Sequence, residues 1–319
     1  MATRWTLYQP IGAGYLTFPT LSDELRRATY PLYEFRQFVR PEASEGRTGE
    51  IHYFTRIGRV TDLVNPIGEQ DQGIPLQVPA ISRGQVIIQD YLAYMEFTER
   101  LERFALWDVQ NVLIETLKMN MAHNLDVRVA SVLKTTPIKA VPTSASALAF
   151  YRTDKGETPT QAGAAALTSA HVKDAVDYMR IDMQVPPYDG TNYVCIAHGK
   201  AIRKLHDDIG DSFLKYTTPE HFYRSEVAQW YGCRIVQTNN SDALSGAAGT
   251  GSTKTPEAIF LAFDPVIEVI SIPEEIRAET VANTFGRVKR IGWFFSGAWA
   301  LTWDTSDPGQ CRVIYVTSA

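Results

Sequence analysis

The most regular hydrophobic pattern in the chain lies within residues 85–136, a stretch without proline or glycine. In its second half, residues 105–134, apolar residues recur mostly at steps of three and four, as on one face of an α-helix. A helix of that length would run roughly 45 Å at about 1.5 Å per residue. Pro137 ends it, because proline lacks a backbone N–H and disfavours helical angles in the preceding residue. We therefore predict one long helix that crosses most of a domain. Its apolar positions are Leu106, Val109, Val112, Leu113, Leu117, Met119, Ala122, Val127, Ala130 and Leu133.

A second clear pattern lies near the end of the chain, where apolar residues occupy alternate positions between Ile291 and Trp303. This alternation is typical of a long strand with one buried face. Gly297 falls in the same row and leaves space on that face, so we expect another element, such as the long helix, to approach closely there. The other members of the row are Trp293, Phe295, Trp299 and Leu301.

Residues 46–84 carry many glycines and prolines that separate short strand-like runs at 50–57, 76–81 and, just beyond, 86–88. Two strands joined by a turn-rich tip predict an extended β-hairpin. An isolated hairpin is marginally stable in water, so it must rest either on this chain or on another copy of it.

The remaining patterns are shorter. We predict a surface excursion at 140–166, a helix from the N-cap Thr168 to Met183, and another helix at 199–209. Residues 241–255 are a predicted loop. The predicted strands are 193–197, 234–238, most of 258–272, and 312–316. Interleaved strands and helices indicate an α/β or α+β module.

Residues 1–45 mix aromatic and polar residues with little period and with several prolines. This segment is too apolar for a disordered tail and too broken to form a core of its own. We predict an arm that lies on a neighbouring surface.

Composition narrows the class of protein. A chain of 319 residues with 45% apolar content can bury a large core. No window reaches the roughly 18 apolar residues of a membrane span, and no export signal opens the chain. The net charge of −5 excludes the broad basic field of a non-specific nucleic-acid binder. Cys195, Cys233 and Cys311 are far apart and odd in number, which favours buried, reduced thiols.

No catalytic, cofactor-binding or metal-binding set stands out. The loop 246–255 lacks a lysine directly after its last glycine, so it is not a P-loop, and Gly12-Ala13-Gly14 lacks the third glycine of a dinucleotide fingerprint. Ser296-Gly297 does not complete a nucleophile elbow. The tryptophan row has no lysine or arginine beside it, which favours core packing over nucleic-acid stacking. The histidines and the acidic cluster show no ligand spacing; they are His52, His123, His171, His198, His206, His221, Asp207, Asp208 and Asp211.

An arm, a long hairpin, a very long helix, a mixed module and a long terminal strand occur in this order in the major capsid proteins of tailed bacteriophages. The chain resembles that HK97-type fold over nearly its whole length, and it is most similar to the group that includes the phage N4 major capsid protein. Four local runs carry the resemblance: Gly49 to Phe54, Leu125-Asp126, Asn192 to His198, and Gly232 to Thr238.

The resemblance implies an α+β fold and a division of the chain. Residues 1–45 would be the N-terminal arm, 46–96 the extended hairpin or E-loop, and 97–184 a P-domain that contains the spine helix 105–134. Residues 185–272 would be the A-domain and 273–319 the return strands of the P-domain. Gly68-Glu69 departs from the Glu-Gly that relatives often carry at the hairpin tip.

The resemblance further implies a non-enzymatic shell protein of the virion, assembled in the host cytoplasm from hexamers and pentamers around double-stranded DNA. Expected partners are other copies, a portal, cement proteins, and either a separate scaffolding protein or none; no sequence-specific DNA contact, membrane or cofactor is expected. The first lysine is Lys118, so the hairpin has no lysine that could form a covalent cross-link between subunits. Two alternatives remain open at this point: an encapsulin-type nanocompartment and a soluble enzyme with an unrecognised site.

Overall fold

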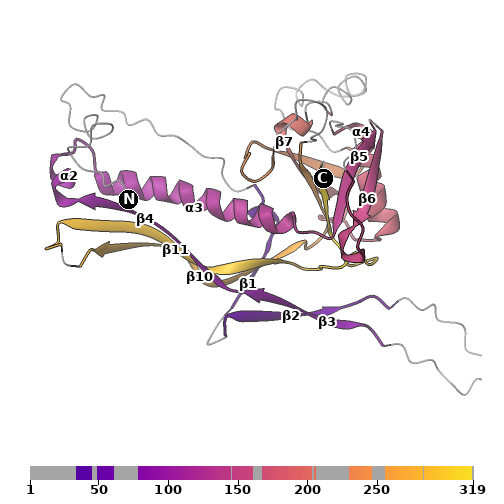
Figure 1. The fold of residues 1–319 in the computed structure, drawn as a ribbon, viewed down its shortest axis with the longest axis horizontal. Coiled ribbons are helices and arrows are strands. Elements are labelled where there is room, and N and C mark those ends of the chain that lie inside the picture. The colour runs from indigo at the N-terminus through magenta and orange to yellow at the C-terminus, as the bar shows by residue number, and fades with distance from the viewer. Residues whose placement is uncertain are drawn as a thin grey trace, which may run out of the picture.

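The structure is a computed structural model that describes residues 34–44, 49–60, 78–144, 146–160, 167–202, 205, 230–245, 256–282 and 284–317. The molecule is elongated (Figure 1). A long helix lies along a narrow sheet, a second sheet lies at one end, and a two-stranded hairpin projects from the underside of the first sheet.

The long layer packs helix α3 (Val109–Leu133) against a four-stranded sheet of order β1-β10-β11-β4. The sheet consists of β1 (Arg40–Ala43), β10 (Val266–Thr280), β11 (Val288–Leu301) and β4 (Gln89–Thr98). Strand β1 runs parallel to β10, and the other two pairs are antiparallel. Apolar side chains of the helix and the sheet form one core, and the indole N–H of Trp293 donates to Asn120 of the helix across 3.1 Å.

The long helix is confirmed, but it begins four residues later than predicted. Asp108 is its N-cap and accepts the backbone N–H groups of Gln110 and Asn111. Residues 105–108 are not helical, and a separate short helix, α2 (Glu99–Phe104), precedes them. The predicted start at residue 105 was wrong, because Ala105 is extended and ends α2. Leu106 is consequently exposed and does not belong to the buried stripe.

The alternating strand is confirmed as β11, with Trp293, Phe295 and Trp299 buried. The space at Gly297 is not filled by the helix. A Cβ at this position would lie 2.6 Å from the ring of Phe295 and 2.6 Å from the carbonyl oxygen of Val269 on β10. The glycine therefore lets an aromatic ring of its own strand fold over it while β10 stays paired.

The second sheet has six strands in the order β6-β5-β12-β9-β7-β8 and a core of its own. Helix α4 (Ser169–Asp177) packs against β6 and continues into a π-helical turn, η3 (Tyr178–Asp182). Thr168 is the predicted N-cap: its hydroxyl accepts the N–H of His171, and the ring of His171 accepts the N–H of Thr168. The strands are β6 (Ala147–Arg152), β5 (Ile138–Ser144), β12 (Val313–Val316), β9 (Ala258–Leu261), β7 (Tyr193–His198) and β8 (Cys233–Thr238).

The interpretation of residues 140–166 as a surface excursion was wrong for its first part. Strand β5 pairs with both β12 and β6, and its residues Ile138, Ala140 and Val141 are buried. Their small and β-branched side chains fit inside a sheet, although the threonines and serines that follow suggest a loop. All three cysteines are buried and free, as predicted.

Candidate assembly surfaces

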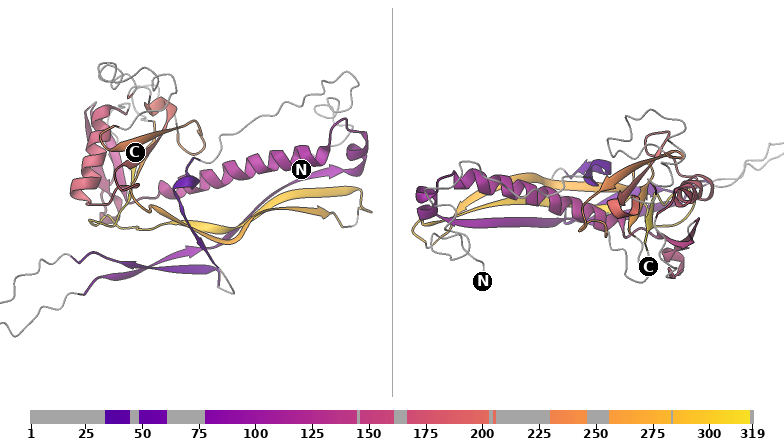
Figure 2. Two further views of the ribbon diagram at one scale, coloured as in Figure 1. Left: turned by 180° about the vertical axis from the view of Figure 1, so that it is seen from behind. Right: turned by 90° about the horizontal axis from the view of Figure 1, so that it is seen from above.

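The projecting hairpin consists of β2 (Ile51–Ile57) and β3 (Ile81–Ile87), paired antiparallel from Ile51↔Ile87 to Ile57↔Ile81. The extended hairpin is confirmed. Its second strand lies at 81–87 rather than at 76–81, and the predicted residues 76 and 77 lie outside the described part of the chain. The ribbon leaves the four-stranded sheet at an angle (Figures 1 and 2), and just beyond β2 the guanidinium of Arg59 donates to the side-chain oxygen of Gln184, after η3.

The face of the hairpin that turns toward the body is held by packing and by one buried cation. Val86 packs with Ile267, Val269 and Ala298 of the long sheet. Arg56 is buried; its guanidinium donates to Asp304 across 2.5 Å and to the carbonyl oxygen of Leu301 across 3.1 Å. An arginine that donates from two nitrogens to two separate acceptors fixes orientation as well as position. Val86 near the root and Arg56 near the far end of the paired strands therefore hold the ribbon against the body.

The opposite face of the hairpin is apolar and open to solvent. Because side chains alternate along a strand, all odd-numbered positions of both strands share this face. Its large apolar side chains are between 41% and 69% exposed, and the side chains of Thr55, Arg83 and Gln85 lie among them. An apolar row on a protruding two-stranded ribbon marks a surface for another protein. We call this row the outer hairpin face: Ile51, Tyr53, Ile57, Ile81 and Ile87.

The end of the predicted arm is joined to the long helix by a buried carboxylate. One oxygen of Asp126, on α3, accepts the backbone N–H groups of Glu34, Phe35 and Arg36 at 3.0, 2.8 and 3.1 Å. Phe35 and Phe38 are buried, and β1, which begins two residues after Phe38, pairs with β10. Residues 34–44, which the sequence assigns to an arm on a neighbouring surface, thus pair and pack with their own chain.

Arg36 lies in a group of carboxylates at this junction. It pairs with Glu268 at 2.9 Å and with Glu274, and its guanidinium lies 5.6 Å from the ring of Phe295. Burial raises the pKa of Glu268, although Arg36 opposes that shift. Burial likewise raises the pKa of Asp126 above its ordinary value, although the three N–H donors oppose it, and raises the pKa of Glu34.

Replacing Asp126 by alanine should destabilise the subunit by about 3 kcal/mol, because one buried and two partly buried N–H donors lose their acceptor. Asparagine would keep an oxygen at the same place without the charge, so Asp126→Asn should cost clearly less. Urea unfolding of the isolated subunit measures both free energies. Equal losses for the two variants would mean that these hydrogen bonds contribute little.

The same pair of variants has a pH signature. A raised folded-state pKa means that the folded chain holds its proton more tightly than the unfolded chain, so stability falls as pH rises from the ordinary pKa of aspartate to the raised value. Glu34 and Glu268 shift in the same direction, so the contribution of Asp126 is the difference between the wild-type and Asp126→Asn curves. We expect that difference to decrease with rising pH across this window.

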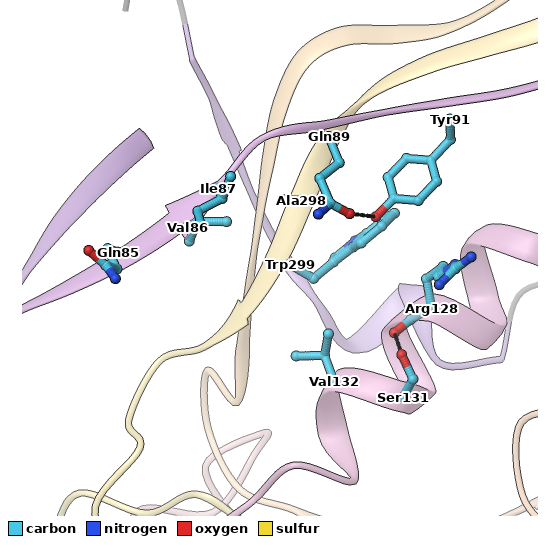
Figure 3. Close-up of a pocket in the computed structure, with 10 residues that line it drawn as sticks. All are labelled: Gln85, Val86, Ile87, Gln89, Tyr91, Arg128, Ser131, Val132, Ala298 and Trp299. Carbon is cyan, nitrogen blue, oxygen red and sulfur yellow. Dashed lines mark hydrogen bonds between the residues drawn. The ribbon is translucent and has the colours of Figure 1, made fainter. Parts of the chain in front are cut away.

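A groove of about 370 Å³ lies between the hairpin root and the long helix (Figure 3). Arg128 stacks on the ring of Tyr91 at 5.5 Å, and the hydroxyl of Ser131 donates to a carbonyl of its own helix. None of the described residues that line the groove is a carboxylate, a cysteine or a histidine. Its walls are Gln85, Val86, Ile87, Gln89, Tyr91, Arg128, Ser131, Val132, Ala298 and Trp299.

The described histidines have structural partners. His171 caps α4, His123 lies 3.0 Å from Asp242, and His52 lies 3.7 Å from Glu42 of β1. Within the described ranges, no three side chains of metal-ligating type come together, and no helix is both long and apolar enough to cross a membrane. Other sequence candidates lie outside the described residues: Gly12-Ala13-Gly14, His206, His221, Asp207, Asp208, Asp211 and the loop 246–255.

Two features of the surface have no counterpart in the sequence-based predictions. Strand β4 forms the edge of the long sheet and exposes Leu92 and Tyr94 on the side away from α3. This strand could have been predicted, because alternate residues along it pack against the core: Tyr91, Ala93, Met95 and Phe97. The other feature is the tip of the β10–β11 hairpin, which carries an exposed phenylalanine.

The sequence itself matches no protein-family model and no curated protein. The structure, however, is similar to solved phage capsids over nearly its whole length. The capsid of Ralstonia phage GP4 is 14% identical with a TM-score of 0.67, covering 99% of this chain and 98% of that one. The acid-stable capsid of Helicobacter pylori bacteriophage KHP30 is 9% identical with a TM-score of 0.67 and the same coverage. The capsid of cyanophage P-SCSP1u is 12% identical with a TM-score of 0.66, covering 97% of this chain and 94% of that one. The chain therefore has the HK97-type fold of phage capsid proteins.

Proposed function

We propose that this chain is the major capsid protein of a tailed bacteriophage and assembles into an icosahedral shell around double-stranded DNA. The observation that carries the proposal is the outer hairpin face: an exposed apolar row on a ribbon whose other side is fixed to the body. Similarity to phage capsids across the whole chain supports it. An enzyme needs a site, whereas a shell protein needs surfaces that fit other copies of itself.

A single subunit leaves one apolar face of the hairpin in contact with water. The outer hairpin face exposes five large apolar side chains on a ribbon that has only its inner side on the body. Apolar surface gains about 25 cal/mol per Å² when it leaves water, and a stable interface buries about 800 Å² per partner. A second copy placed against this face would bury it, and each copy would in turn offer the same face to the next.

Further parts of the proposal follow from the resemblance to the phage N4-like group, which we propose as the closest group. Residues 1–45, 46–96, 97–184, 185–272 and 273–319 would be arm, hairpin, P-domain, A-domain and return strands. Copies would form hexamers and pentamers in the host cytoplasm, with a portal, a separate scaffolding protein and cement proteins as partners. The packaged DNA would touch an overall acidic protein without sequence-specific contacts.

Purified protein should elute as capsomers or as megadalton particles in size-exclusion chromatography, and electron micrographs should show closed shells. Particles from infected cells should contain DNA, whereas an enzyme cargo would indicate a nanocompartment instead. On a denaturing gel these particles should run as single chains without a covalent ladder, because no lysine precedes Lys118 to form a hairpin cross-link. A small, discrete oligomer under all assembly conditions would contradict the proposal.

A further inference from the structure

The tip of the β10–β11 hairpin is a tight turn with an unexpected residue in it. The N–H of Arg287 donates to the carbonyl oxygen of Thr284 across 3.0 Å, and the two central residues, Phe285 and Gly286, have φ angles of +50° and +76°. Positive φ at both central positions defines a type I′ turn, for which asparagine and glycine are the usual residues. A phenylalanine is strained in this conformation, because its Cβ crowds the backbone.

Phe285 gains nothing within its own chain in return for that strain. Its side chain is 101% exposed, the highest exposure among the large apolar residues of the described part of the chain. The turn itself is held firmly: Thr284 donates its hydroxyl to the carbonyl of Val281, and the carbonyl of Arg287 accepts the N–H of Glu99 across 2.9 Å. A rigid turn that presents a strained, fully exposed aromatic ring has the properties of an anchor for a partner.

The same end of the molecule also offers a surface that such an anchor fits. Helix α2 lies beside the turn, where Lys289 of β11 pairs with Glu102 at 2.7 Å (Figures 1 and 2). At the end of α2 and just after it, Phe104 and Leu106 are both exposed. Two apolar side chains next to a charged helix provide an apolar contact with a polar rim, the usual arrangement at the centre of an interface.

The charges at this end allow a second copy of this chain as the partner, which the proposed self-assembly supplies. Helix α2 carries Glu99 and Arg103 as an exposed ion pair, and the turn region carries both Glu279 and Arg287 on its surface. Both contact regions therefore present both signs of charge, so one copy's turn can face another copy's helix without like-charge repulsion. A surface that binds nucleic acid would instead carry mainly lysine and arginine at this end.

We propose that Phe285 of one copy inserts between Phe104 and Leu106 of a second copy, so that the ends of neighbouring subunits meet through this contact. The inference rests on the proposed self-assembly and adds a specific contact to it. It implies that the turn at Phe285 lowers the stability of the isolated subunit and raises the stability of the assembly.

The test replaces Phe285 by asparagine, the residue that the turn prefers. Phe285→Asn should leave the thermal unfolding midpoint of the isolated subunit unchanged or raise it by a few degrees, since it relieves the strain. It should also raise the protein concentration at which shells form at least about tenfold, which corresponds to about 1.4 kcal/mol per copy. A lower midpoint would mean that Phe285 stabilises its own chain, and an unchanged threshold would mean that it contacts no other copy. Either result overturns the inference.

A second measurement identifies the receiving surface. A photoreactive phenylalanine analogue at position 285, in particles built from mixed isotope-labelled and unlabelled copies, should cross-link to the tryptic peptide 104–118 of another copy. Cross-links to other peptides, to another protein, or only within one copy overturn the proposed contact. If wild-type protein forms no particles at all, it is the proposed function that fails, independently of Phe285.

Discussion

Replacing Leu117 by aspartate should abolish soluble, folded subunit. Leu117 is 1% exposed on the face of α3 that packs against the long sheet, in the core that also contains Trp293 and Phe295. An unpaired carboxylate at this position would lose its hydration without gaining a partner, which costs several kcal/mol. Domains are stable by only about 5–15 kcal/mol in total, and the lost leucine contacts add about 2–5 kcal/mol to the cost.

The matched control is the same change at Leu106, which is 54% exposed in the segment between α2 and α3. Leu106→Asp should express as soluble protein with a thermal midpoint close to that of the wild type, because aspartate there remains hydrated. The soluble fraction after expression and the circular dichroism melting curve measure both variants. If Leu117→Asp melted within a few degrees of wild type, the packing of α3 on the sheet would be wrong.

The two strongest periodicities predicted the two elements that form the long layer. The apolar steps of three and four between residues 109 and 133 persist for about seven turns, and the alternation in β11 runs along most of the strand, so each pattern dominates local preference. Thr168 was also predictable, because an N-cap acts through contacts within one turn. These signals depend on neighbours in the sequence.

The elements that were missed or misplaced depend on contacts between distant residues. Strand β4 lies in a run without breakers that also suits a helix, and only its pairing with β11 makes it a strand. Strand β5 reads as a polar excursion until β12, far along the chain, pairs with it. The start of α3 was set by a local cap, Asp108, but the apolar residue Leu106 before it extended the apparent pattern.

The same limit applies to the assembly surfaces. A hairpin could be predicted from turn residues, but its odd positions are the more apolar ones, so the strand pattern alone would place them against the body. Which row faces the body depends on Val86 meeting Ala298 and on Arg56 reaching Asp304, far along the chain. For the arm, the sequence suggested a neighbouring surface throughout, whereas Asp126 joins its last part to the helix. The exposure of Phe285 could not be predicted, because a phenylalanine next to a glycine is not distinctive in a sequence.

Replacing Ile57 by glutamate should prevent shell formation while leaving the subunit folded. Ile57 is 64% exposed on the outer hairpin face, opposite Ile81, which is 69% exposed. Glutamate at this position stays hydrated in the free subunit, so the unfolding midpoint should change little. In an assembled shell the same carboxylate would be buried against another copy without a partner, and this penalty would recur at every copy. Ile81→Glu should act in the same way; the two changes are made singly, because paired glutamates across the ladder would repel each other within the hairpin.

Ile181→Glu provides the matched control. Ile181 is 65% exposed in the π-helical turn after α4 and is not part of the outer hairpin face, so the same substitution is made at an equally exposed isoleucine. Sedimentation velocity and electron microscopy would quantify shells, and thermal melting would verify each subunit. We expect Ile181→Glu to assemble at wild-type yield, whereas Ile57→Glu and Ile81→Glu remain as free subunits or capsomers. Normal shells from both hairpin variants would show that the outer hairpin face stays in water after assembly. In that case the exposed row could not be the surface that joins the copies, and the proposal would lose the observation on which it depends.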